Sequence, residues 1–117
     1  MEAGHTLSSP LGRITISSEA IAQVVVQTAA ECYGVVGMSA RGRVGRILSR
    51  ARARQGVEVG GDGEGVRVDL FVVVEYGLNL AEVAGTVRRR VAYELERLTG
   101  LPVAAVEVHI QDVRQSA

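Results

Sequence analysis

Few side chains in the sequence have the chemistry of a catalytic or metal-binding site. The single cysteine, Cys32, falls on the apolar side of a predicted helix, where a thiol is shielded and unreactive. Of the two histidines, His5 lies near the N-terminus, and His109 shares one side of a predicted strand with Glu107, where a solvated imidazole is expected. No group of Cys and His residues has metal-ligand spacing, and no glycine-rich phosphate motif follows a strand. We therefore predict no enzyme, and no catalytic, cofactor-binding or metal-binding residues.

An arginine-rich stretch is the segment whose charge could attract a ligand. Residues 41–55 contain six Arg and no acidic residue, whereas residues 56–87 contain six acidic residues and one Arg. Gly42 and Gly45 form a GxxG, the motif whose backbone clamps nucleotides in KH domains, and the arginines could neutralise phosphates. However, GxxG is a weak pattern in a chain with 14 Gly, and aromatic residues for base stacking are scarce. A solvated surface helix within residues 41–54 is the simpler interpretation.

The most regular stretch is a strand that leads into a long helix. Over residues 66–76 every second residue is apolar, which predicts a central strand with one wholly apolar face. The other face is charged at its ends but carries Phe71 and Val73 in the middle, so we expect a second copy of the chain to cover them. Over residues 80–98 apolar residues recur at spacings of three and four, which predicts an amphipathic helix capped by Asn79.

The remaining predicted elements are shorter. Residues 13–16 alternate as a strand with both Ile side chains facing inward, and a second helical stripe covers residues 21–32. Residues 35–38 are interpreted as a short buried connection that returns the chain to the core. A short strand is predicted at residues 57–59, and a last strand at residues 103–110. This order, β-α-(short α)-β-β-α-β, predicts a two-layer α+β domain in which two main helices cover one face of a single mixed or antiparallel sheet.

The length of 117 residues is that of one domain. We expect a flexible N-terminal tail over residues 1–11, a single folded domain over residues 12–114 and a C-terminal tail over residues 115–117. The longest apolar run, residues 70–74, is far shorter than a membrane span, and no secretory signal is visible. One cysteine cannot form an internal disulfide. We therefore expect a cytoplasmic protein that reaches a membrane only through a partner.

Four segments, taken together, resemble one protein family. They are residues 12–21 (GRITISSEAI), 34–38 (GVVGM), 68–77 (VDLFVVVEYG) and 99–110, which begins TGLPV and ends VEVHI. Their order and spacing are similar to those of the alkaline shock protein family, also called the Gls-type general stress or envelope stress response family, of Gram-positive bacteria. The resemblance covers residues 12–114. It implies a small non-enzymatic α+β protein in the cytoplasm, held near the membrane by a membrane-anchored relative, with a role in cell-envelope homeostasis under stress.

Two functions are consistent with these observations. In the first, the chain is a structural or interaction module that forms homo-oligomers and binds a membrane-anchored protein of the same family. In the alternative, residues 41–54 bind RNA or anionic lipid as a KH-like module, with affinity that falls as salt rises. Neither function involves a cofactor or a small-molecule substrate. The candidate interaction surface comprises Arg41, Arg43, Arg46, Arg50, Arg52, Arg54, Phe71 and Val73.

Overall fold

The structure is a computed structural model that describes residues 4–39 and 56–115. The predicted short helix within residues 41–54 lies outside these ranges. The elements within them are, in chain order, β1 (Gly4–Ser9), β2 (Gly12–Ser17), α1 (Ser18–Ala30), β3 (Val35–Met38), β4 (Val57–Asp62), β5 (Gly65–Glu75), α3 (Leu80–Thr99) and β6 (Val103–Arg114).

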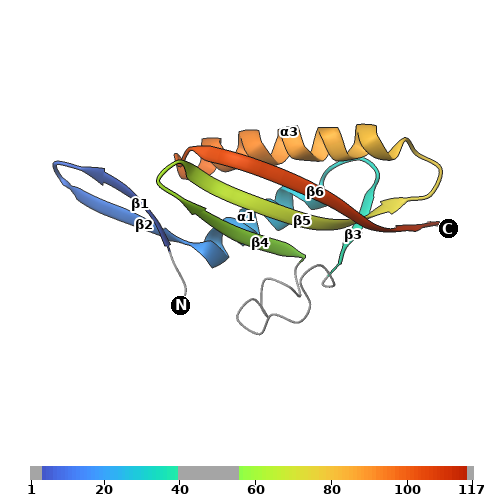
Figure 1. Cartoon of the computed structure of the whole chain (residues 1–117), viewed down its shortest axis with the longest axis horizontal. Coiled ribbons are helices and arrows are strands. Elements are labelled where there is room, and N and C mark those ends of the chain that lie inside the picture. Colours follow the sequence, from blue (N-terminus) through green and yellow to red (C-terminus); the bar gives the residue numbers. More distant parts are fainter. Residues whose placement is uncertain (1–3, 40–55, 116–117) are drawn as a thin grey trace.

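Strand β5 is the axis of the main sheet. Strand β6 runs parallel to it along one edge, in a register that joins Val66 to Val103 at one end and Glu75 to Arg114 at the other. The opposite edge of β5 is shared, because β4 pairs antiparallel with its first half and β3 pairs antiparallel with its second half. The sheet is therefore mixed, which is one of the two arrangements predicted (Figure 1).

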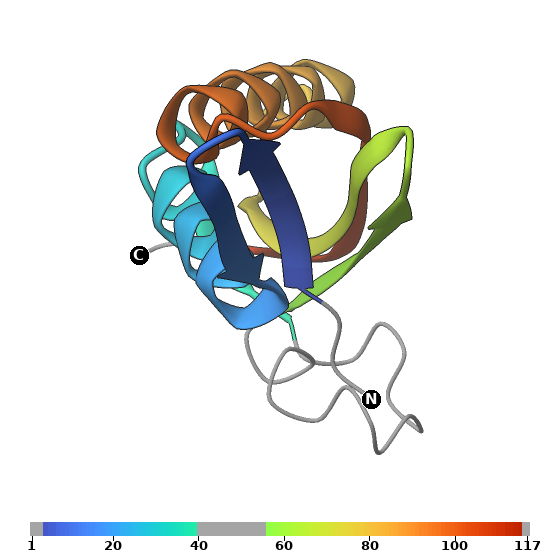
Figure 2. The ribbon, with the colours of Figure 1, turned by 90° about the vertical axis from the view of Figure 1, so that its left-hand side faces the viewer.

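Both helices pack on the same face of this sheet. The even-numbered residues from Val66 to Val74 face the helices, and each is at most 1% exposed. They form one core cluster with Ile21 and Val25 of α1 and with Val87 and Leu95 of α3. Burying each such side chain contributes roughly 1.5–3 kcal/mol of transfer free energy. Figure 2 shows α1 and α3 side by side over the strands, so the predicted two-layer α+β fold is confirmed.

Each helix begins at a capping side chain, and the cap of α3 is the predicted Asn79. The Ser17 hydroxyl accepts a hydrogen bond from the amide of Ala20 at 3.0 Å, and the Asn79 side chain accepts one from the amide of Glu82 at 3.0 Å. Each cap stabilises its helix by about 1 kcal/mol. Helix α3 ends at Gly100, which adopts a left-handed conformation with φ of 75°.

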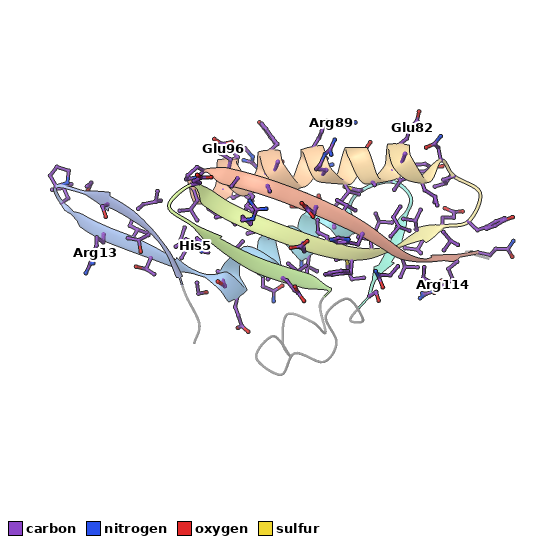
Figure 3. All side chains as sticks on the ribbon, viewed as in Figure 1. His5, Arg13, Glu82, Arg89, Glu96 and Arg114 are labelled. Atoms are coloured by element: carbon purple, nitrogen blue, oxygen red, sulfur yellow. The ribbon has the colours of Figure 1, made fainter. Side chains whose placement is uncertain are left out.

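The outer side of α3 is charged. Glu82, Arg89 and Glu96 are exposed, and Figure 3 shows them pointing away from the sheet. The buried residues of the helix, Val83, Val87, Val91 and Leu95, occupy the inner side, as the spacing of three and four predicted. Leu80 and Leu98, at the ends of the predicted stripe, are 39% and 54% exposed.

The N-terminal residues differ from the predicted flexible tail over residues 1–11. Residues 4–9 form β1, which pairs antiparallel with β2 across a turn at Pro10 and Leu11. The prediction was wrong because a strand takes its hydrogen bonds from a partner, and the Gly, Ser and Pro content of this segment does not reveal that partner. The hairpin projects from the body of the domain (Figure 1). Ile14, predicted to face inward, is consequently 63% exposed.

Candidate functional site on the sheet face opposite α1 and α3

The sheet face opposite the helices carries a row of acidic residues. Glu58 of β4 is the register partner of Asp69 of β5, and Asp69 is in turn the partner of Glu107 of β6. All three occupy positions that alternate with the core residues, so their side chains belong to the face away from the helices. Like charges opposite one another destabilise a sheet. A positive charge or hydrogen-bond donor beside Asp69 and Glu107 would relieve their repulsion.

His109 of β6 supplies a polar partner for this row. Its Nε2 lies 2.9 Å from Oδ1 of Asp69, and both side chains are about one-third exposed, at 39% and 32%. The imidazole also stacks on the ring of Phe71, with centroids 4.7 Å apart and planes 13° apart. The sequence predicted a solvated histidine, whereas the structure gives His109 a carboxylate partner and an aromatic support. Contacts with Asp69 and Phe71 thus position its ring.

Three potential ligand side chains meet at this point. The donor atoms of Asp69, Glu107 and His109 all lie within 4.8 Å of one another. Within residues 4–39 and 56–115, no other group of three or more His, Cys, Asp or Glu residues gathers in this way. The sequence pattern placed Glu107 beside His109 but did not indicate Asp69. Asp69 lies near these two residues only because of the register between β5 and β6. Carboxylate oxygens and an imidazole nitrogen at this distance can share a proton or coordinate a cation.

The predicted interaction residues lie elsewhere on this face or outside the described residues. Phe71 and Val73 are buried within the chain, at 6% and 2% exposure, and they do not belong to the core cluster beneath the helices. The stacked ring of His109 covers part of Phe71. These two residues therefore offer little apolar area to a second copy. The six arginines, Arg41, Arg43, Arg46, Arg50, Arg52 and Arg54, fall outside the described residues.

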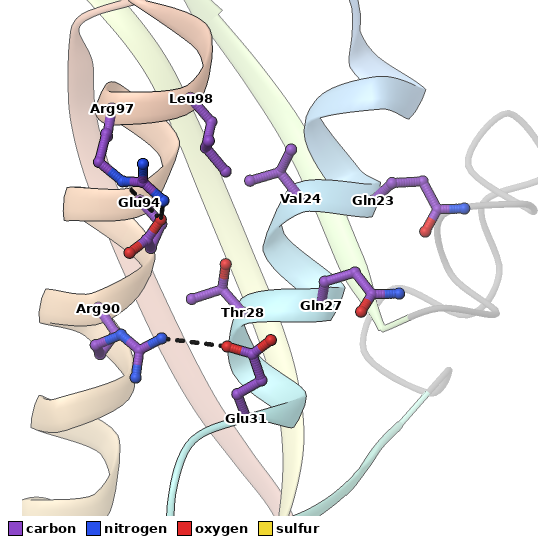
Figure 4. Close-up of a pocket in the computed structure, with 9 residues that line it drawn as sticks. All are labelled: Gln23, Val24, Gln27, Thr28, Glu31, Arg90, Glu94, Arg97 and Leu98. Carbon is purple, nitrogen blue, oxygen red and sulfur yellow. Dashed lines mark hydrogen bonds and ion pairs between the residues drawn. The ribbon is translucent and has the colours of Figure 1, made fainter.

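A groove of about 410 Å³ lies between the two helices on the other side of the molecule (Figure 4). Its charged side chains pair with one another: Arg90 bonds to Glu31 at 3.3 Å, and Arg97 bonds to Glu94 at 2.7 Å. Such exposed pairs each contribute at most about 1 kcal/mol. The residues that line the groove are Gln23, Val24, Gln27, Thr28, Glu31, Arg90, Glu94, Arg97 and Leu98.

Cys32 is a buried thiol, as predicted. It is 5% exposed, and its Sγ donates a hydrogen bond to the carbonyl oxygen of Thr28 at 3.5 Å. Burial raises the pKa of the Cys32 thiol, and the nearby Glu31 carboxylate raises it further, against an opposing effect of Arg90. A raised pKa keeps the sulfur protonated, and a protonated thiol is a poor nucleophile.

No helix in the described part of the chain is both long and apolar enough to span a membrane.

The sequence matches known proteins over nearly its whole length. The model of the alkaline shock protein family, which is described as having a "cell envelope-related function", matches residues 6–115. The uncharacterized protein YloU of Bacillus subtilis is 36% identical over 112 residues, which cover 92% of this chain and 93% of that protein. The uncharacterized protein Spy1614 of Streptococcus pyogenes is 33% identical over 107 residues, which cover 88% of each protein.

Solved structures share the fold at low sequence identity. The copper form of MamM CTD superposes with a TM-score of 0.58 at 15% identity, covering 81% of this chain and 85% of that one. A nickel form of a MamM CTD variant gives a TM-score of 0.55 at 15% identity, covering 85% of this chain and 99% of that one. At this identity the likeness concerns the fold alone.

Proposed function

The chain belongs to the alkaline shock protein family, which has a cell envelope-related function, and from this premise we propose that it is a non-catalytic interaction module. Its role is cell-envelope homeostasis near the membrane. It works in the cytoplasm and reaches the membrane through a membrane-anchored protein of the same family. This role follows the sequence resemblance over residues 12–114.

The observation that supports an interaction module most directly is the projecting hairpin of β1 and β2. At its turn Leu11 is 99% exposed, and Ile14 on β2 is 63% exposed. A two-stranded hairpin alone is only marginally stable in water, and its open strand edges can pair with another chain. Contact with a second copy would bury these side chains and satisfy the edges. The hairpin is therefore the proposed self-association element.

The chemistry of the described residues supports a non-catalytic role. The thiol of Cys32 is buried with a raised pKa, and the charged residues of the inter-helix groove pair with one another. Catalysis requires a nucleophile or base that a substrate can reach. The cluster of Asp69, Glu107 and His109 offers partly exposed donor atoms.

Light scattering coupled to size-exclusion chromatography tests self-association. We expect the mass of the wild-type chain to rise with concentration, and the double variant Leu11→Ser with Ile14→Thr to stay monomeric. The matched control is Tyr93→Ser, because Tyr93 is 63% exposed on α3, far from the hairpin in sequence, and should leave association unchanged. A wild-type monomer at every concentration would refute self-association. Association that survives in the double variant would refute the role of the hairpin.

The alternative function, binding of RNA or anionic lipid, is favoured by one observation. Residues 41–55 carry six Arg and no acidic residue. The triple variant with Arg46, Arg50 and Arg52 each changed to Glu should then lose binding to a single-stranded RNA or to anionic vesicles, and wild-type binding should weaken as salt rises. Binding that is unchanged by both salt and the triple substitution would eliminate this alternative.

A further inference from the structure

Asp69 of β5 and Glu107 of β6 carry like charges, and a hydrogen bond with His109 offsets their repulsion only in part. Asp69 and Glu107 are register partners on adjacent strands, so their carboxylates repel each other when both are ionised. A neutral imidazole can donate one hydrogen bond to Asp69 but carries no charge to offset the pair. A divalent cation would neutralise both carboxylates at once.

The donor atoms are placed for such a cation. Zinc binds imidazole nitrogen and carboxylate oxygen at about 2.0–2.2 Å, which sets neighbouring ligand atoms roughly 3 Å apart. Nε2 of His109 and Oδ1 of Asp69 are already separated by 2.9 Å. The third donor, from Glu107, lies within 4.8 Å of both. Glu107 is exposed, so a change of rotamer can bring its carboxylate closer without disturbing the core.

The rigidity of the site favours binding. His109 and Asp69 lie near the middle of two long paired strands, and Phe71 supports the imidazole ring by stacking. Ligand side chains on a rigid scaffold lose little conformational entropy on binding, so ordering them offsets little of the free energy of coordination. The positive charge of Arg67 would disfavour cation binding, because Arg67 lies two positions before Asp69 on the same face of β5. It is exposed, which allows its guanidinium to stay in solvent.

We propose that Asp69, Glu107 and His109 bind one divalent transition-metal ion of the zinc class, with water completing the coordination. One imidazole and two carboxylates make a mixed nitrogen and oxygen donor set, which suits Zn²⁺, Ni²⁺ or Cu²⁺ better than Mg²⁺ or Ca²⁺. Two carboxylates balance the double charge of the ion. This site is independent of the proposed interaction function, because it lies on the main sheet rather than on the hairpin.

Isothermal titration of the full chain with zinc chloride, after removal of any affinity tag, tests the proposal. We expect one ion per chain for the wild type, and no competition from excess Mg²⁺ or Ca²⁺. Three variants each remove one donor while keeping shape: His109→Phe keeps a ring to stack on Phe71, Asp69→Asn keeps a hydrogen-bonding group, and Glu107→Gln keeps length. Each should weaken zinc binding at least about tenfold, the scale at which metal sites respond to a changed ligand environment.

Two matched controls separate this site from unspecific binding. His5→Phe makes the same substitution at the other histidine, and Glu96→Gln neutralises an exposed acid on α3. Both should bind zinc as the wild type does. Circular dichroism and thermal melting of each variant would verify folding, and the two amide variants keep the test decisive if His109→Phe does not fold. A wild type that does not bind zinc, or donor variants that bind as tightly as the controls, would overturn the proposal.

Discussion

The two faces of β5 are built from alternate residues of one strand, yet they differ in exposure and in polarity. On the inner face, the even-numbered residues from Val66 to Val74 are at most 1% exposed and pack beneath α1 and α3. On the outer face, exposed Arg67 and half-buried Asp69 precede the buried pair Phe71 and Val73. All side chains of the inner face are apolar and pack against the helices. The outer face carries both charged side chains and buried apolar ones.

Leu70 and Phe71 are both buried, but they pack against different kinds of neighbour. Leu70 is completely buried within the core cluster, where it contacts other apolar side chains. Phe71 is 6% exposed but lies outside that cluster and supports the ring of His109. The first residue holds the layers together, and the second positions a side chain that has donor chemistry.

The largest expected contrast is between two sequence neighbours, Leu70 and Asp69. Leu70→Ala should lower the free energy of unfolding by about 2–5 kcal/mol, because it leaves a cavity between sheet and helices. Asp69→Asn should lower it by less than about 1 kcal/mol, since a partly exposed pair with His109 contributes little. Urea unfolding monitored by circular dichroism measures both. Equal losses would contradict the assignment of Leu70 to the core and Asp69 to a surface cluster.

A matched pair of valines sharpens the comparison between faces. Val68 and Val73 are both almost fully buried, at 1% and 2% exposure, but on opposite faces. Val68→Thr should cost about 1–3 kcal/mol, because its hydroxyl enters an apolar core without a partner. Val73→Thr should cost less, because polar groups lie on its face. Chemical denaturation of the two variants side by side would reveal the order, and a larger loss at Val73 would reverse our interpretation.

The support of His109 by Phe71 predicts a smaller effect. His109→Ala removes the stacked ring and should destabilise the fold by about 0.5–1.5 kcal/mol. His109→Phe retains a ring at the same position and should retain most of that stability, although it removes the donor nitrogen. Thermal melting of both variants distinguishes them. If the two lose equal stability, the stacking contact with Phe71 does not contribute.

Cys32 offers the smallest effect, and it depends on pH. The pKa of its thiol is raised in the folded state by burial, so the unfolded chain loses this proton at a lower pH than the folded chain. The thiol therefore favours folding below its ordinary pKa, and this contribution is lost as pH rises through the raised value. Stability of the wild type should fall more steeply in alkali than that of Cys32→Ala. Parallel slopes in denaturation experiments across alkaline pH would contradict this expectation.

The sequence predicted the features that depend on local pattern. Alternation identified β5, the spacing of apolar residues identified α3, and the side chain of Asn79 marked where that helix begins. These features are local because helix caps and side-chain periodicity involve residues that are close in sequence.

Features that depend on pairing were missed. Strand β1 exists because β2 satisfies its hydrogen bonds, and its composition carries no sign of this. Asp69 and His109 are 40 positions apart and meet only because β5 and β6 pair in one parallel register. A different register would place His109 beside another residue, so the pattern of either strand alone could not reveal the cluster.

The most direct test of the contrast between the two faces is an NMR titration of the wild-type chain with zinc, observed at the imidazole nitrogens. We predict that the His109 resonances shift or broaden while those of His5 stay in place, and that the amides of α1 and α3 over the inner face do not move. Equal changes at both histidines, or none at His109, would contradict the claim that the face of β5 and β6 opposite α1 and α3 carries a specific metal-binding site.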